Sequence, residues 1–135
     1  PYARTRSYEQ YREKWLTSPQ PHDYLSHLAE SMRDERTMAE MLEDDGSIAG
    51  YLWVTFSDVI DFNITIAEVM DIAVASDYQH RGIGLEMFNH IEEVARAKGA
   101  ALLRSDTGIA NVASHRLHEK AGFKPYRIHY EKIIG

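Results

Sequence analysis

The chain has 135 residues, of which 44% are hydrophobic, which is enough for one buried core and too little for two ordinary domains. Its formal net charge of −6 at pH 7 argues against nucleic acid as a partner, because proteins that bind a phosphate backbone usually carry basic patches. The absence of cysteine excludes disulfides, thiolate metal ligands and a cysteine nucleophile.

The N-terminal part of the chain is expected to be helical. Apolar residues at helical spacing predict helices over residues 8–17 and 23–33, with a break at the Pro-Gln-Pro sequence between them. No stretch is long and apolar enough for a membrane span or a secretory signal, so a cytoplasmic location and no membrane partner are expected. Because the chain begins at proline, we expect that an upstream segment, which could include a first strand, has been removed.

Three strands are predicted in the middle of the chain, over residues 37–43, 48–56 and 64–74. The Asp-Asp-Gly sequence at 44–46 is a strong hairpin signal between the first two. The third is almost wholly apolar, as expected of a strand that is covered on both faces. Glu68 and Asp71 interrupt this apolar run, and two charges there call for a functional or structural reason.

The strongest helix signal begins at Ile83, where apolar residues recur at intervals of three, four and seven, and it ends at Lys98-Gly99. A short strand is then predicted over residues 100–106. It is followed by a helix over 112–120 with Asn111 as its N-cap, and by a closing strand over 126–134. This order of elements predicts a single mixed α/β domain over residues 1–135.

Gly82 and Gly84 lie where a strand passes through a turn into this helix. The N–H groups at the start of such a helix lack partners within the helix and lie at the positive end of the helix dipole, so they can bind an anion. The turn therefore predicts a phosphate site, to which Arg81 adds a positive charge. The alternative is that the glycines only shape a tight connection. A dinucleotide fingerprint would need a third glycine where Met87 stands, and no P-loop lysine follows.

The sequence IAVASDYQHRGIGLEMF resembles the acetyl-CoA-binding segment of the GNAT N-acetyltransferases, whose Gln/Arg-x-x-Gly-x-Gly/Ala fingerprint is matched by Gln79, Gly82 and Gly84. NVASHRLHEKAGF at 111–123 resembles the family's C-terminal motif. Ser-Asp at 105–106 followed by N-x-x-S-H-x-x-H is similar to the aminoglycoside 6′-acetyltransferase branch. The resemblance implies the GNAT fold, a mixed and mostly antiparallel sheet flanked by helices and splayed where acetyl-CoA binds.

The resemblance also implies acetyl-CoA as co-substrate, with its pyrophosphate on the glycine turn and its pantetheine arm against the preceding strand. The cofactor-binding residues implied in this way are Ile72, Ala73, Val74, Gln79, His80, Arg81, Gly82, Ile83, Gly84, Leu85, Asn111 and Ser114. No metal is expected, because the His-x-x-His spacing at 115–118 has no third ligand nearby.

Acetyl transfer to an amine needs a base, and Glu68 or Asp71 could supply it, since burial raises the pKa of a carboxyl group. Strand alternation places the two side chains on opposite faces unless a bulge intervenes. Glu68 is preferred because it precedes Gln79 by the same number of residues as the catalytic glutamate does in the histone-acetylating branch of the family, which this part of the chain resembles.

The departing thiolate needs an acid, which in the family is usually a tyrosine of the C-terminal motif. This chain has His118 at that position, and histidine can also donate a proton. Helical spacing places His118 on one face with Asn111, Ser114 and His115. The alternative is that the two histidines form a solvated pair on an exposed helix face.

The expected activity is acetyl-CoA-dependent acetylation of a primary amine by direct attack in a ternary complex. Asp58 and Asp61, in the loop before the third strand, suit a small cationic acceptor, as do the aromatic residues of the N-terminal region. The alternatives are a protein amine as acceptor, a non-catalytic acyl-CoA-binding module and a nucleotide-binding domain. Whether the chain forms a homodimer stays open.

Overall fold

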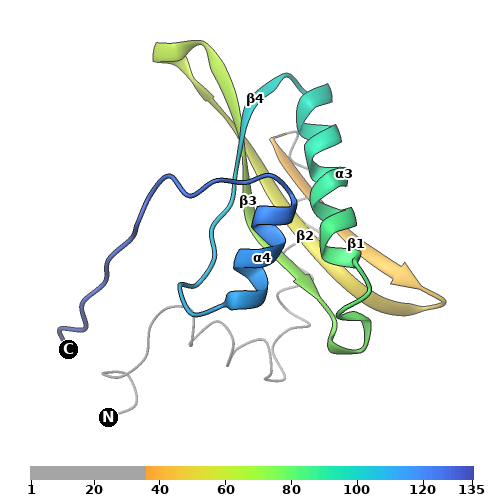
Figure 1. The fold of residues 1–135 in the computed structure, drawn as a ribbon. Coiled ribbons are helices and arrows are strands. Elements are labelled where there is room, and N and C mark those ends of the chain that lie inside the picture. The colour runs from red at the N-terminus through yellow and green to blue at the C-terminus, as the bar shows by residue number, and fades with distance from the viewer. Residues whose placement is uncertain (1–35) are drawn as a thin grey trace.

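In residues 36–135, which are the residues that the computed structural model describes, four strands form one sheet with the order β1-β2-β3-β4 (Figure 1). The helices expected over residues 8–17 and 23–33 lie outside the described residues. The elements are β1 (Thr37–Asp44), β2 (Ser47–Val59), η2 (Ile60–Phe62), β3 (Ile64–Val74), η3 (Ser76–Tyr78), α3 (Ile83–Ala97), β4 (Ala100–Arg104) and α4 (Val112–Lys120). The pairings of β1 with β2 and of β2 with β3 are antiparallel and that of β3 with β4 is parallel, which confirms the predicted mixed sheet.

The turn between β1 and β2 is built by Asp45 and Gly46. Their φ angles are 46° and 82°, and a two-residue turn of type I′ requires positive φ at both positions. Asp44 pairs directly with Ser47 across the turn, so the hairpin predicted at 44–46 is confirmed.

Both described helices contribute to the core on one face of the sheet. α3 buries Met87, Phe88, Ile91 and Ala95 against the core face of β2 and β3, and α4 adds Leu117 to the same cluster. The opposite face carries a smaller cluster around Ala39 and Tyr51, with Trp53 and Ala73. Within the described residues, no helix is both long and apolar enough to cross a membrane.

Strand β3 contains a bulge at Met70. Trp53 of β2 pairs with Asp71, but the next residue, Val54, pairs with Val69, so Met70 has no partner of its own. A single extra residue of this kind changes which face of the sheet the following side chains point to.

The sheet is splayed between β3 and β4. Their parallel pairing ends at Glu68 and Arg104, where β4 also ends, whereas β3 continues to Val74. The last part of β3 therefore has a hydrogen-bonding edge with no strand beside it in the described structure. This confirms the splay expected of the fold.

The closing strand predicted over residues 126–134 is wrong. This segment forms neither a helix nor a strand, and it extends away from the sheet to the C-terminus (Figure 1). The alternating pattern of its sequence indicates a preference for extended backbone. A strand also needs the edge of a sheet to pair with, and the pattern does not predict one.

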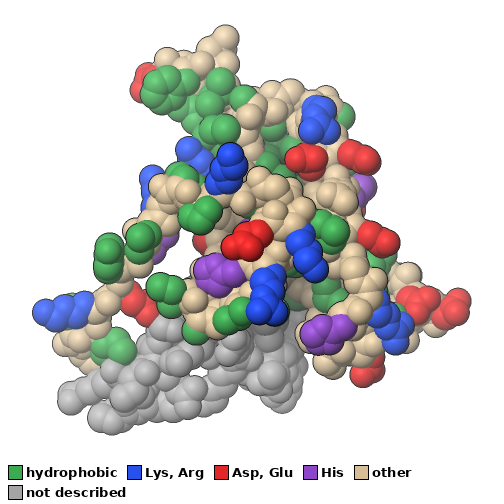
Figure 2. Space-filling model, in the orientation of Figure 1, with side chains coloured by type: hydrophobic (Ala, Val, Ile, Leu, Met, Phe, Trp, Pro, Cys, Tyr) green, Lys and Arg blue, Asp and Glu red, His purple; other side chains and the backbone are tan. Residues whose placement is uncertain are grey.

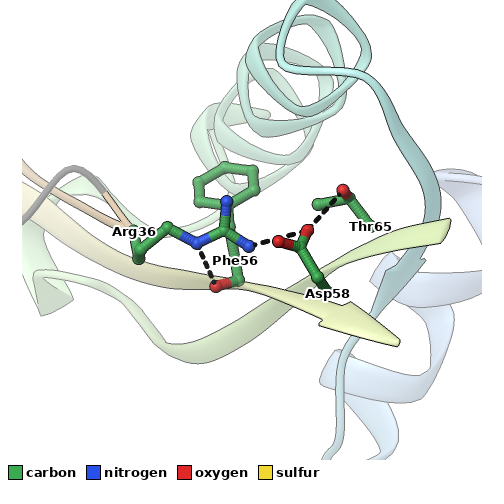
Figure 3. Close-up of polar contacts among 4 residues, drawn as sticks. All are labelled: Arg36, Phe56, Asp58 and Thr65. Atoms are coloured by element: carbon green, nitrogen blue, oxygen red, sulfur yellow. Dashed lines mark hydrogen bonds and ion pairs between the residues drawn. The ribbon is translucent and has the colours of Figure 1, made fainter. Parts of the chain in front are cut away.

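Asp58 of β2 contacts both Thr65 of β3 and Arg36, the residue before β1. Its carboxylate accepts a hydrogen bond from Thr65 Oγ1 at 2.8 Å and lies 2.9 Å from Arg36 Nη2 (Figure 3). Arg36 Nε also donates to the Phe56 carbonyl oxygen at 3.2 Å. The hydrogen bond from Thr65, followed by that from Arg36, lowers the pKa of Asp58 below its usual 3.8.

A lowered folded-state pKa means that Asp58 stabilises the fold above pH 3.8 and loses this contribution as the pH falls through the folded value. We expect Asp58→Asn to lower the melting temperature by only a few degrees at pH 7, because the group is exposed to solvent. The difference from the parent protein should shrink in thermal melts at progressively lower pH. Ser57→Ala on the same strand is the control, and a pH-independent difference for Asp58→Asn would contradict the assignment.

Candidate active site

The turn after β3 leads into an open helix N-terminus. Helix α3 begins at Ile83 with Gly82 as N-cap, and its first main-chain bond runs from Glu86 N–H to the Gly82 carbonyl at 3.1 Å. The amides of Ile83, Gly84 and Leu85 therefore lack partners within the helix, and the N-cap glycine has no side chain that could accept from them. Such a group of N–H donors at the positive end of the helix dipole suits a phosphate.

The two glycines of the turn are needed for different reasons. Gly82 has a φ of 77°, a left-handed conformation that a side chain strongly disfavours, and the space around it is open. At Gly84, a Cβ would lie 2.8 Å from Leu117 Cδ2, so this glycine allows α4 to pack closely on α3. The left-handed φ of Gly82 fits the tight-connection interpretation as well as a phosphate site, whereas Gly84 serves the packing of α4 on α3.

Other predicted cofactor-binding residues shape the same turn. Gln79 Nε2 donates to the Val74 carbonyl oxygen at 3.3 Å, which joins the turn to the end of β3. His80 adopts a left-handed φ of 64°, and the Arg81 guanidinium lies 5.2 Å from the centroid of the Tyr78 ring. Arg81 itself is exposed, so its charge stands at the surface beside the open amides.

Asn111 and Ser114 have local partners at the start of α4. The Asn111 side-chain oxygen accepts from Ser114 N–H at 3.1 Å, which confirms Asn111 as the N-cap. Ser114 Oγ accepts from Thr107 Oγ1 at 2.7 Å. Unlike α3, helix α4 therefore begins with a filled cap, and contact of these two residues with a cofactor stays a prediction.

His118 is half-buried in a cluster of three rings with Phe88 and Phe123, which also contact each other. Its ring centroid lies 5.0 Å from that of Phe88 and 5.2 Å from that of Phe123. The solvated-pair interpretation is therefore wrong for His118. His115 is exposed, and its Nε2 lies 3.1 Å from the Ile109 carbonyl oxygen.

Both ring nitrogens of His118 have defined partners. Nδ1 lies 2.7 Å from the Ser114 carbonyl oxygen, which can only accept, so Nδ1 carries a proton. Nε2 lies 2.8 Å from Ser105 Oγ, and in the neutral ring it accepts from that hydroxyl. Ser105, directly after β4, thus stands between the histidine and anything that approaches Nε2. Ser105 belongs to the Ser-Asp sequence at 105–106, from which no role for this serine was predicted.

The bulge at Met70 brings Glu68 and Asp71 to the same face of the sheet, away from α3. Val69 before the bulge and Ile72 after it both belong to the core under α3, so the residues next to them face the other way. The sequence predicted that the two side chains point to opposite faces unless a bulge lies between them, and the structure contains such a bulge. The two carboxylates can share one site on that face.

The two carboxylates have different surroundings. Asp71 is 9% exposed and accepts a hydrogen bond from Tyr51 OH at 3.0 Å. Glu68 is exposed and pairs in register with Arg104, at the point where β3 and β4 separate. The expected burial thus holds for Asp71 and not for Glu68.

The structure brings several of the predicted residues together at the splay. The free edge of β3 over Ile72–Val74 leads directly into the glycine turn and the open N-terminus of α3. Ser105 follows the end of β4, and His118 of α4 reaches it. Within residues 36–135, no group of three or more acidic, histidine or cysteine side chains is placed to hold a metal ion.

The chain is similar to a defined group of known proteins. The model of the family described as "Acetyltransferase (GNAT) family" matches residues 3–123. A Bacillus subtilis protein ascribed N-acetyltransferase activity toward the alanine of ribosomal protein bS18 is 26% identical over 112 residues, which cover 82% of this chain and 68% of that protein. The aminoglycoside N(6′)-acetyltransferase type 1 of Serratia marcescens is 27% identical over 124 residues, covering 87% and 85%.

The fold is also shared with solved structures. The aminoglycoside N-acetyltransferase AAC(6′)-Iy in complex with CoA superposes with a TM-score of 0.67 at 19% identity, over 82% of this chain and 87% of that one. At this level of identity the likeness concerns the fold alone.

Proposed function

Because this chain belongs to the GNAT family of acetyltransferases, we propose that it transfers the acetyl group of acetyl-CoA to the primary amine of a small cationic acceptor. The observation that carries this proposal is the continuity of the free β3 edge with the open N-terminus of α3. One feature offers strand amides to an extended amide chain, and the other offers helix amides to a diphosphate.

In the proposed complex, the amides of residues 83–85 hold the pyrophosphate and Arg81 adds a formal positive charge. The pantetheine arm lies along Ile72–Val74 as an additional strand would. These contacts are local, so the acidic net charge of the chain does not oppose them.

The chemistry is a direct attack of the amine nitrogen on the thioester carbonyl carbon, which breaks the C–S bond. Glu68 or Asp71 takes the proton that the amine loses, and strand amides near Ile72–Val74 stabilise the negative charge on the carbonyl oxygen. This step requires the imidazolium form of His118, in which Nε2–H donates to Ser105 Oγ. The serine gives its own hydroxyl proton to the leaving thiolate and takes the proton of Nε2, so the ring ends neutral with its remaining proton on Nδ1. An acetyl-cysteine intermediate is excluded because the chain has no cysteine.

The nature of the acceptor is the least constrained part of the proposal. The similarity to an aminoglycoside acetyltransferase over most of both chains supports a small cationic amine, and the exposed Glu68 offers a carboxylate on the sheet face. Asp58 adds less than the sequence suggested, because Arg36 already neutralises it. The Bacillus subtilis relative favours the alternative, the terminal amine of a protein.

Two assays test these possibilities in turn. Thermal-shift titrations with acetyl-CoA, CoA, ATP and NAD identify the ligand class, and a stronger response to ATP or NAD would favour a nucleotide-binding domain. Thiol release is then followed with aminoglycosides, polyamines, amino acids and a peptide that begins with alanine. Release with the peptide alone would favour the protein acceptor, and binding without release from any amine would favour a non-catalytic module.

We expect His118→Ala to lower the turnover number by about ten- to a thousandfold. This is less than the about hundred- to ten-thousandfold typical of general acid catalysis, because a thiolate is a fair leaving group and needs less help from an acid. The substitution also removes the ring that packs against both Phe88 and Phe123, so the melting temperature must be measured beside the rate. Ser105→Ala is the matched variant, since it interrupts the same path with little loss of packing. Unchanged turnover in both variants would remove the histidine from the mechanism.

A further inference from the structure

A cavity of about 230 Å³ lies between the first two turns of α3 and the strands β1 and β2. Leu52 and Met87, in its lining, are buried, whereas Met41 and Leu42 are 39% and 41% exposed. The cavity therefore combines apolar walls with ionisable side chains, as sites for small molecules usually do. Its lining residues are Glu40, Met41, Leu42, Leu52, Ile83, Glu86, Met87 and His90.

One of the two carboxylates in this lining is unpaired. Glu40 Oε2 lies 2.8 Å from His90 Nε2, which carries a proton because a carboxylate can only accept. Glu86, by contrast, is exposed and enters no ion pair within residues 36–135. A free carboxylate beside an apolar cavity suits a cation that also carries an apolar group.

The surroundings of the cavity are acidic as well. Residues 37–46, which form β1 and its turn, contain four acidic residues and no lysine or arginine. Helix α3 carries three glutamates and one arginine. In Figure 2, acidic side chains gather over α3 and the β1–β2 hairpin, on the right of the view. Such a surface attracts cations and repels anions, so the charge of the ligand is positive.

The volume and the lining of the cavity define the apolar part of the ligand. An apolar cavity of about 150 Å³ can hold benzene, so this one accommodates about six carbon atoms or slightly more. Met41 and Met87 are unbranched and flexible, which lets them adapt to such a group. We propose that the cavity binds a primary ammonium ion with an aliphatic group of this size, whose charge lies against Glu86.

This site shares the first turn of α3 with the diphosphate site, so its ligand should raise the affinity for acetyl-CoA; this coupling rests on the proposed function. Ile83 lines the cavity, and its amide is one of those that we place on the diphosphate. The negative charge of Glu86, in the same turn, opposes a bound diphosphate. An ammonium group on Glu86 cancels this charge. Coupling of binding sites is reciprocal, so acetyl-CoA should also raise the affinity for the amine.

The first test uses methionine methyl groups as reporters of the site. In protein labelled with ¹³C at these methyl groups, hexylamine should shift the signals of Met41 and Met87, which line the cavity. Met70 of β3 lies outside the lining and reports binding on the acceptor face instead. 1-Hexanol has the same shape without the charge and should bind about two- to fivefold more weakly, the size of an exposed ion pair. Unchanged signals of Met41 and Met87, or equal binding of the amine and the alcohol, would overturn the proposal.

Glu86→Gln separates the charge of this side chain from its shape. The variant should bind hexylamine about two- to fivefold more weakly and 1-hexanol as the unmodified protein does. Glu93→Gln is the matched control, because Glu93 is exposed on the same helix but does not line the cavity. An equal loss of amine affinity in both variants would show that the acidic surface as a whole attracts the amine, without a site at Glu86.

The second test measures the coupling by calorimetric titration with CoA, which has no acetyl group to consume the amine. Hexylamine should lower the Kd for CoA about two- to fivefold in the unmodified protein. Glu86→Gln should bind CoA more tightly by itself, and the amine should add nothing further. An unchanged Kd in the unmodified protein would overturn the coupling. Methionine shifts in a protein that binds no CoA would uphold the cavity site and refute the proposed function, so the two failures are distinguishable.

Discussion

Gly82→Val is expected to abolish acetyl-CoA binding. Gly82 has a φ of 77°, and a β-branched side chain strongly resists this left-handed conformation. A Cβ at this position would meet no other atom within 4 Å in the free protein, and we expect it to obstruct the pyrophosphate that we place on the adjacent amides of residues 83–85. Backbone strain of about 1–2 kcal/mol and direct obstruction therefore act together. Calorimetric titration with acetyl-CoA should show no binding at concentrations that saturate the unmodified protein.

Gly46→Val is the matched control for this substitution. Gly46 has a φ of 82° and is also surrounded by open space, but it lies in the β1–β2 hairpin turn. Its replacement should lower the melting temperature and leave acetyl-CoA affinity unchanged. Binding that survives Gly82→Val, or is lost equally in Gly46→Val, would show that the glycine turn is not the diphosphate site.

The parts of the fold that the sequence predicted correctly depend on interactions between residues close in the chain. Asp45 and Gly46 determine their hairpin because their own φ angles select the turn. Asn111 caps α4 through a bond to a residue three positions later. The apolar stripe of α3 is likewise read within one helix, and its buried residues are those at the predicted spacing.

The parts that the sequence did not predict depend on residues far apart in the chain. The bulge at Met70 is visible only from the pairing of β3 with β2, yet it decides that Glu68 and Asp71 share a face. The role of Gly84 depends on the approach of Leu117 from a later helix. The partner of Ser105 is His118, which folding brings next to the end of β4.

The same distinction explains the error at the C-terminus. The alternating pattern in residues 126–134 is a local property and predicts extended backbone. Whether an extended segment becomes a strand depends on the edge available to it, and its own β4 does not hold it in this structure. The predicted strand is therefore wrong, because the pattern records a local preference and says nothing about an edge to pair with.

Glu68→Gln is expected to lower the turnover number at neutral pH by about a hundred- to ten-thousandfold, the range typical of a lost general base. Glu68 is exposed where β3 and β4 separate, so it can accept a proton from a bound amine and pass it to water. The loss should diminish as the pH approaches the amine's own pKa of about 10, because the amine then arrives deprotonated. A pH profile of thiol release for both proteins measures this recovery.

Asp71→Asn is the companion variant, because it changes the other carboxylate on the same face. Asp71 is buried and accepts a hydrogen bond from Tyr51 OH, so its replacement should lower the melting temperature clearly and the turnover number only slightly. A large loss of turnover in Asp71→Asn with a small loss in Glu68→Gln would transfer the role of base to Asp71. If both variants turn over at the rate of the unmodified protein, neither carboxylate removes the proton, and the amine must lose it to solvent before the attack.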